Sequence, residues 1–264
     1  MSTPQEESAK VEKIVIQGNM RKYKGFRLAP FYNNCASADA IGCNLTSCFA
    51  CWTNKSNINP EKYGKFYTPD EVVDNLFSLN CNNNRITSGE PLVGLQHFMN
   101  VIDRFATKIT TLHSNVVKKF IIETNGTLLT EDVVKFLMSY VGIIHVRLSF
   151  KGINRVTFID NAAKDWFDYQ LNALGLLIKY NIPYHIALLN IYTSDEIDDF
   201  LDLIRYGKEI SYKDTGVKKS SKLINNIELE KPVFYPFVKE RLKLDERYIN
   251  IRKRLIKCNL LSTK

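Results

Sequence analysis

The stretch from Lys118 to Gly152, "KKFIIETNGTLLTEDVVKFLMSYVGIIHVRLSFKG", contains one complete unit of the fold that we predict. One apolar run ends in the turn "ETNG", and a second ends in "SFKG". Between them, "TEDVVKFLMSY" has apolar residues at helical spacing and offers Thr130 as the helix N-cap. Strands that alternate with helices pair in parallel, because the crossover helix returns the chain to the same end of the sheet.

The same alternation continues on both sides of this stretch. Upstream, Thr68 and Pro69 begin the predicted helix "TPDEVVDNLFSL", a strand follows in "NNRITSGEP", and a helix in "LVGLQHFMNVIDRFATK". Downstream we predict a helix in "AKDWFDYQLNALGLLIKY", a strand in "IPYHIALLNIY" and a helix in "SDEIDDFLDLIRYGKEI" that is capped by Ser194. A series of this kind predicts an α/β fold with a parallel sheet or barrel.

The two ends of the chain differ from this central series. Residues 1–29 are expected to form an unordered polar tail and short strands around Gly18 and Gly25. Residues 30–205 form the predicted core. Residues 206–264 are expected to cover the barrel opening, with a Lys-rich loop over 206–233, a late strand in "PVFYPFV" and a basic helix.

Composition excludes several classes of protein. With 264 residues and a hydrophobic fraction of 45%, the chain is globular rather than disordered. It has no apolar run long enough for a membrane span and no apolar leader, so we expect a cytoplasmic protein with no membrane partner. The net charge of +8 leaves nucleic acid open as a partner.

Three cysteines, Cys43, Cys48 and Cys51, lie within nine residues in "GCNLTSCFACW". A structural zinc site needs four ligands, usually in two spaced pairs, and no second pair follows at such a spacing. Three thiolates without a fourth suit a 4Fe–4S cluster with one open iron. Zinc and plain core packing remain alternatives. The scattered Cys35, Cys81 and Cys258 are predicted to be core thiols.

Polar motifs with a glycine follow several of the predicted strands: "TSGEP", "ETNG" and "SFKG". In a parallel barrel, all strand C-termini lie on one face, where active sites are found. Gly89 permits close approach of a ligand to the backbone, and Ser149 and Lys151 alternate along a strand and so share a side. Of the four histidines, only His185 is kept as a site candidate.

The order of these motifs resembles the radical S-adenosylmethionine (SAM) superfamily, and most closely its glycyl-radical-enzyme activase branch. The resemblance covers about residues 30–205 and implies a partial (β/α)6 TIM-like barrel. It implies that Cys43, Cys48 and Cys51 ligate three irons of a 4Fe–4S cluster, in preference to a set that includes Cys35, and that SAM binds the fourth iron. The implied SAM contacts are Phe49 for adenine, with Trp52 as the alternative, and Ser88, Gly89, Glu90, Glu123, Asn125, Ser149 and Lys151.

The resemblance also implies a reaction. One electron, from a donor such as ferredoxin or flavodoxin, cleaves SAM to methionine and a 5′-deoxyadenosyl radical, which abstracts hydrogen from a protein or small metabolite. No side chain is assigned as catalytic. The sequence departs from the family pattern in its four-residue gap between Cys43 and Cys48, so we predict a bulge over residues 44–47. An RNA-modifying radical SAM enzyme and a non-catalytic zinc or iron–sulfur module remain alternatives.

Overall fold

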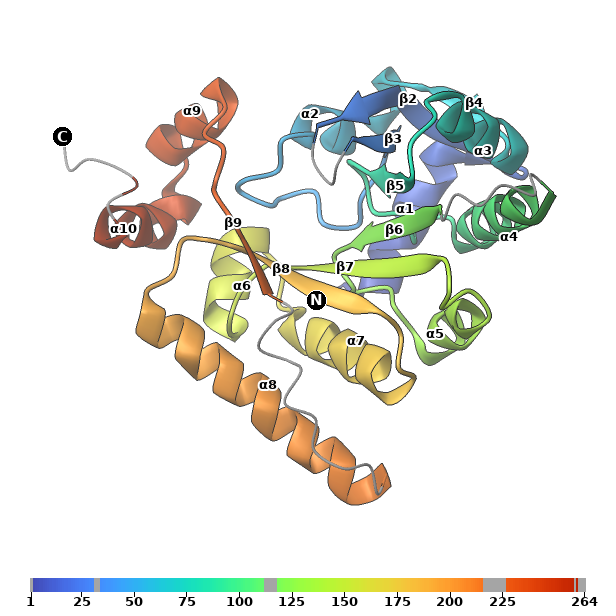
Figure 1. Cartoon of the computed structure of the whole chain (residues 1–264). Coiled ribbons are helices and arrows are strands. Elements are labelled where there is room, and N and C mark those ends of the chain that lie inside the picture. Colours follow the sequence, from blue (N-terminus) through green and yellow to red (C-terminus); the bar gives the residue numbers. More distant parts are fainter. Residues whose placement is uncertain (1, 31–33, 112–117, 216–226, 259, 261–264) are drawn as a thin grey trace. The chain divides into compact units, whose positions relative to one another are not determined.

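The computed structural model describes residues 2–30, 34–111, 118–215, 227–258 and 260 (Figure 1). The chain divides into two compact units, which we describe one at a time. The first unit comprises Met1–Thr46, Thr53–Thr124 and Leu128–Arg147. The second comprises Ser47–Trp52, Asn125–Thr127 and Leu148–Lys264.

The first unit contains a sheet whose strands follow the order β1-β2-β3-β5-β6-β7, with β4 beside β2. Strand β2 pairs antiparallel with β1, β3 and β4, whereas β3, β5 and β6 pair in parallel. The strands are β1 (Ile16–Gln17), β2 (Met20–Ala29), β3 (Cys35–Ala40), β4 (Lys65–Tyr67), β5 (Asn83–Thr87), β6 (Lys119–Thr124) and β7 (Ile144–Phe150), whose last three residues belong to the second unit. The predicted parallel pairing is therefore confirmed for the central strands.

Helices pack on this sheet through their apolar faces. Thr68 forms a capping box with Glu71 at the start of α3, and Thr130 caps α5, as the sequence predicts for both threonines. The buried residues Val72, Val73 and Leu76 recur at helical spacing along α3. The helices of this unit are α1 (Pro4–Val15), α2 (Asn54–Ile58), α3 (Pro69–Ser78), α4 (Leu95–Thr111) and α5 (Glu131–Met138), with the 3-10 turn η1 (Pro60–Lys62).

The second unit contains the end of β7 followed in the sheet by β8 and β9, and β8 and β9 pair in parallel. Its core includes a cluster of aromatic rings in which Phe150 of β7 lies 5.3 Å from Phe200 and 6.5 Å from Phe167. The elements are β8 (Tyr184–Leu189), β9 (Ile227–Glu230), α6 (Arg155–Ala162), α7 (Phe167–Lys179), α8 (Ser194–Thr215), α9 (Pro236–Leu244), η3 (Glu246–Tyr248) and α10 (Ile249–Lys257). The α/β class is confirmed in both units.

The prediction of an unordered N-terminal tail is wrong, because residues 4–15 form helix α1. Thr3 accepts a hydrogen bond from the backbone of Glu6, the Glu6 carboxylate accepts one from the backbone of Thr3, and Pro4 occupies the first helical position. This capping box satisfies two of the amide groups that a helix start leaves open. Val15, at the end of the helix, is completely buried and anchors it to the unit.

Several predictions for the C-terminal part are also wrong. The predicted loop over 206–233 is helical as far as Thr215 and contains β9, while residues 216–226 lie outside the described part. The predicted strand "PVFYPFV" instead leads into α9, with Pro236 at a position where a missing N–H costs nothing. Thr193, rather than Ser194, forms the hydrogen bonds that cap α8. Helix α6 was not predicted.

The scattered cysteines behave partly as predicted. Cys35 and Cys81 are buried in the first unit, and burial raises the pKa of the Cys35 thiol to about 11. Cys35 begins β3, whereas Cys43 follows the other end of that strand, which argues against Cys35 as an alternative ligand. No helix in the described part of the chain is both long and apolar enough to cross a bilayer.

Candidate cofactor site

The cysteine loop, residues 41–52, begins where β3 ends. Asn44 and Leu45 are buried, whereas Thr46 and Ser47 form a turn and are partly exposed. The bulge over residues 44–47 stays a prediction. The backbone N–H of Leu45 donates to the Cys43 sulfur at 3.4 Å. Among the described residues, no group of three or more Cys, His, Asp or Glu side chains stands in the arrangement of a metal site.

In the first unit, the "SGE" motif after β5 is hydrogen-bonded to the segment that leads into Cys43. The Glu90 N–H donates to the Gly42 carbonyl at 2.9 Å. A Cβ on Gly89 would lie 2.4 Å from the Gly42 oxygen and 3.0 Å from the Ala40 oxygen, so only glycine fits there. Because β3 and β5 are parallel neighbours, both segments leave the sheet at the same edge.

Ser88 occupies an unusual conformation in this motif. Its φ of 77° is left-handed, and its carbonyl accepts hydrogen bonds from Thr53 Oγ1 at 2.8 Å and Asn57 Nδ2 at 3.1 Å. Asn57 Oδ1 also accepts from the Gly42 N–H at 3.2 Å. The Ser88 hydroxyl is buried and has no hydrogen-bond partner among the described residues. Buried polar atoms are normally paired, so this hydroxyl is suited to contact a ligand.

Glu90 is held in place almost without exposure to solvent. Its carboxylate accepts hydrogen bonds from Thr124 Oγ1 at 2.6 Å and from the Leu92 N–H at 3.2 Å. Arg21, which is completely buried, donates to the carbonyls of Glu90 and Pro91 at 2.7 and 2.6 Å. Buried charges require such partners. Glu90 is therefore a rigidly oriented carboxylate beside the "SGE" backbone.

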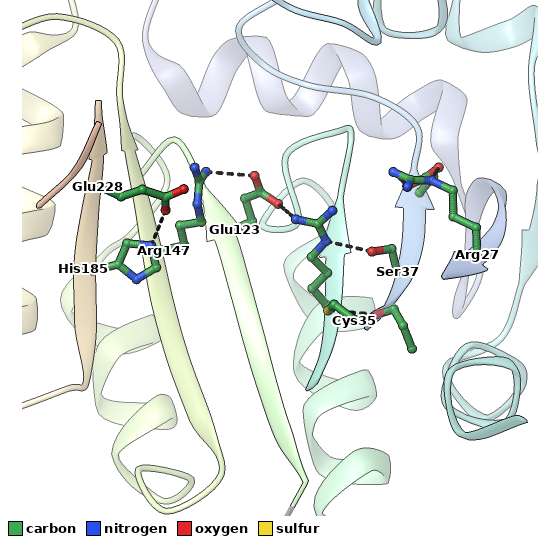
Figure 2. A network of polar contacts seen from close by, with 10 residues as sticks. Arg27, Cys35, Ser37, Glu123, Arg147, His185 and Glu228 are labelled. Atoms are coloured by element: carbon green, nitrogen blue, oxygen red, sulfur yellow. Dashed lines mark hydrogen bonds and ion pairs between the residues drawn. The ribbon is translucent and has the colours of Figure 1, made fainter. Parts of the chain in front are cut away.

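Glu123, the acid of "ETNG", lies between two arginines on neighbouring strands (Figure 2). Its carboxylate is 3.1 Å from Arg85 Nη1 on β5 and 2.9 Å from Arg147 Nη1 on β7. Arg85 Nε in turn donates to Ser37 Oγ on β3 at 2.7 Å. The side chains of Arg85 and Arg147 are 7% and 1% exposed, so Glu123 neutralises buried charge. Its role as a SAM contact stays a prediction.

In the second unit, Gln170 of α7 joins parts of two predicted motifs. It is completely buried, and its amide nitrogen, Nε2, donates to the carbonyls of Asn125 and Ser149, the latter at 2.9 Å. Its Oε1 accepts from the Lys151 N–H at 2.9 Å. Strand β7 ends at Phe150, so Lys151 lies just beyond the strand and not on it as predicted, but its Nζ donates to Ser149 Oγ at 2.7 Å. Sequence reasoning missed Gln170, because an isolated glutamine on an amphipathic helix carries no signal.

The Asn125 side chain supports its own turn. Its Oδ1 accepts from the Thr127 N–H at 2.9 Å and from Thr127 Oγ1 at 2.6 Å. Gly126 has φ of 77°, and a Cβ there would lie 2.4 Å from Leu148 Cδ1. The "ETNG" turn is therefore tightly packed, and the glycine is required for both its conformation and its space.

The part of the cysteine loop that belongs to the second unit, Ser47–Trp52, is held by the C-terminal helices. Arg241 of α9 donates to the Cys48 carbonyl at 3.2 Å and to the Cys51 carbonyl at 3.4 Å. Burial raises the pKa of the Cys48 thiol to about 11, and the positive charges of Lys151 and Arg241 oppose this rise. No local pattern predicts Arg241, because its partners are far away in the sequence.

Phe49, the predicted adenine contact, is almost completely buried. Its ring lies 5.9 Å from that of Tyr248, and its N–H donates to the Asn161 carbonyl at 2.9 Å. The alternative, Trp52, is 42% exposed. Which of the two contacts adenine stays a prediction. His185, the remaining candidate, lies 3.0 Å from the Glu228 carboxylate in the second unit (Figure 2).

Residues 40–204 match the family model described as the radical SAM superfamily. The chain belongs to the radical SAM superfamily. This family uses a 4Fe–4S cluster and SAM, so both cofactors predicted from the resemblance are those of the family. The activase branch that the motifs suggest is not tested by this match.

Two proteins of Methanocaldococcus jannaschii are similar to this radical SAM chain. "Uncharacterized protein MJ0804" is 23% identical over 70% of the chain and 61% of its own length. "Uncharacterized protein MJ0907" is 29% identical over 62% of the chain and 54% of its own length. The chain thus spans less than two thirds of either relative.

Solved structures share the fold. "Native anSMEcpe with bound AdoMet" has a TM-score of 0.52 at 18% identity, over 83% of this chain and 59% of its own. A histidine-tagged form of anSMEcpe with bound AdoMet has a TM-score of 0.51 at 17% identity, over 83% of this chain and 57% of its own. This likeness supports the partial TIM-like barrel.

Proposed function

We propose that the chain is a radical SAM enzyme that holds a 4Fe–4S cluster through Cys43, Cys48 and Cys51 and abstracts hydrogen from a protein or small-metabolite substrate. The observation that carries the proposal is the hydrogen bond between Glu90 and Gly42, 2.9 Å long. It joins the "SGE" motif to the residue before Cys43, at the edge of the sheet where parallel strands end. Two motifs that are distant in sequence therefore lie together.

The residues of this chain fit the two cofactors chemically. Three thiols in one loop provide soft ligands, which suit iron–sulfur clusters. The Ser88 hydroxyl, which has no hydrogen-bond partner among the described residues, offers a polar contact for the amino-acid part of SAM. When bound, the cluster and SAM supply an electron and a 5′-deoxyadenosyl radical. Glu90 would attract the ammonium group, and Ser149 and Lys151 would orient the ribose and carboxylate.

The test is an anaerobic cluster reconstitution followed by reduction in the presence of SAM. We expect the protein to take up about four irons, as for a 4Fe–4S cluster, and to release 5′-deoxyadenosine. The variant Cys48→Ala should lose both properties, whereas Cys258→Ser, at a cysteine outside the loop, should keep both. Retention of SAM cleavage in Cys48→Ala would refute the ligand set. Zinc uptake without cleavage would show that the chain is a non-catalytic metal module instead.

The substrate is sought by deuterium transfer. A labelled substrate passes deuterium to 5′-deoxyadenosine, because the radical takes the atom that it abstracts. Candidate proteins and polar metabolites are compared in parallel, with ferredoxin or flavodoxin as electron donor.

A further inference from the structure

Arg241 of helix α9, in the C-terminal region, donates hydrogen bonds to the backbone of the cysteine loop. Arg241 Nη1 and Nη2 donate to the Cys48 and Cys51 carbonyls, at 3.2 and 3.4 Å. These are the carbonyls of two of the three proposed iron ligands. One planar group thereby bridges both ends of the segment 48–51, whose own turn is closed by a 3.3 Å hydrogen bond from the Cys51 N–H to the Cys48 carbonyl.

The surroundings hold this guanidinium in place. It lies over the Phe237 ring, 5.3 Å from the centroid. Tyr248, which is 2% exposed, donates from its hydroxyl to the Ser47 carbonyl at 3.3 Å and packs its ring against Phe49. Arg241 Nε is buried and has no hydrogen-bond partner among the described residues.

The charge of Arg241 has a consequence for redox chemistry. Reduction adds one negative charge to an iron–sulfur cluster, and a nearby cation stabilises the reduced form, more strongly where water is excluded. Arginine is suited to this role, because its planar, positively charged guanidinium can donate to two carbonyls at once.

We propose that Arg241 is a positioning residue, which orients the segment 48–51 and raises the reduction potential of the cluster that this segment binds. The inference rests on the function proposed above. It assigns to the C-terminal region a task in the chemistry of the cluster, in addition to packing.

The experiment compares the full-length wild type with Arg241→Gln, Arg241→Lys and the control Arg252→Gln. Arg252 is an arginine of α10 that donates to the carbonyls of Leu242 and Asp245, at 2.6 and 3.1 Å, within the C-terminal segment itself. Each protein is reconstituted anaerobically, its iron and sulfide are quantified, and its midpoint potential is measured by a redox titration followed by electron paramagnetic resonance.

We expect the midpoint potential of Arg241→Gln to be more negative than that of the wild type, because the cation is lost. Arg241→Lys retains the charge but not the fork, so its potential should stay nearer that of the wild type while its iron content falls. Arg252→Gln should match the wild type in both. Loss of iron in Arg241→Gln with retention in Arg252→Gln would also support the positioning role.

Equal potentials and iron contents in the wild type and Arg241→Gln would overturn the inference and leave the proposed function intact. Equal loss of iron in Arg241→Gln and Arg252→Gln would overturn it too, because general destabilisation would then explain the result. A wild type that holds zinc and cleaves no SAM would refute the proposed function, and the inference with it.

Discussion

Gly89 shows how a single position joins the fold to the site. Its missing Cβ leaves room for the backbone oxygens of Gly42 and Ala40, which cannot move independently of β3. In the sequence alone, a glycine that follows a predicted strand indicates only an ordinary turn. The contact itself depends on the parallel register of β3 and β5, in which Asp39 is opposite Thr87.

We therefore predict that Gly89→Ala destabilises the protein by about 1–3 kcal/mol, the usual cost of overpacking, and abolishes SAM cleavage. Denaturant unfolding and the 5′-deoxyadenosine assay measure the two effects. Gly142→Ala is the matched control, because a Cβ there meets nothing within 4 Å. Wild-type stability and activity in Gly89→Ala would show that the backbone at this point is not closely packed.

His97 is a second residue with a measurable consequence. Its Nδ1 donates to the Asn19 carbonyl at 2.8 Å, so Nε2 accepts from the Tyr23 hydroxyl at 3.0 Å. Burial, with the charge of Arg21, lowers the pKa of His97 to about 4 from its usual 6.5. Between these two values the unfolded chain binds a proton that the folded protein does not.

Folding stability should consequently fall as the pH drops from about 6.5 to about 4, by up to about 3 kcal/mol from this group alone. The loss should be complete below the folded pKa. Urea unfolding of the wild type and His97→Gln at several pH values isolates this contribution, since carboxylates and other histidines affect both proteins. Parallel pH curves for the two proteins would contradict the prediction.

At the scale of elements, strands β5, β6 and β7 are coupled by Glu123 and its two arginines. The side chain of Glu123 is 21% exposed, and the arginines are more deeply buried. Removing one member of a buried charge network leaves the others without compensation, which costs about 3–5 kcal/mol. Glu123→Gln should lower the free energy of unfolding by an amount of this order.

The control for this prediction is Glu131→Gln on α5. Glu131 lies 3.8 Å from Lys135 at helical spacing, with 44% of its side chain exposed. Surface pairs of this type contribute little, so a change below about 0.5 kcal/mol is expected. Equal effects of the two substitutions in urea unfolding would mean that the Glu123 network does not stabilise the sheet.

The elements could be predicted where local chemistry determines them. The Thr68 and Thr130 caps and the alternating strands and helices between them follow from residue type and spacing. The N-terminal capping box of Thr3 and Glu6 had the same signature, and a polar composition obscured it. The partners of Gln170 and Arg241 could not be predicted, because backbone carbonyls that accept their hydrogen bonds become neighbours only through tertiary packing.

At the scale of the whole molecule, the net charge of +8 and the basic C-terminal segment leave RNA open as a partner. The structure shows that arginines of the basic C-terminal segment serve internal contacts. Arg241 binds the cysteine loop, Arg247 pairs with Asp245, and Arg254 pairs with Glu196. Arginines that are engaged within the protein contribute less to phosphate binding, so this segment offers weaker support for the RNA-modifying alternative than its sequence suggests.

We expect RNA binding to be weak and only shallowly dependent on salt. Proteins that make six to ten phosphate contacts lose about 10³–10⁵ in affinity between about 50 and 200 mM salt, and this chain should lose less than about tenfold. Fluorescence anisotropy with a labelled single-stranded RNA measures the slope. Lys253 and Lys257 are exposed on α10. Replacing both by glutamine should leave the salt dependence of RNA affinity unchanged. A steep slope that these substitutions reduce would instead favour an RNA substrate.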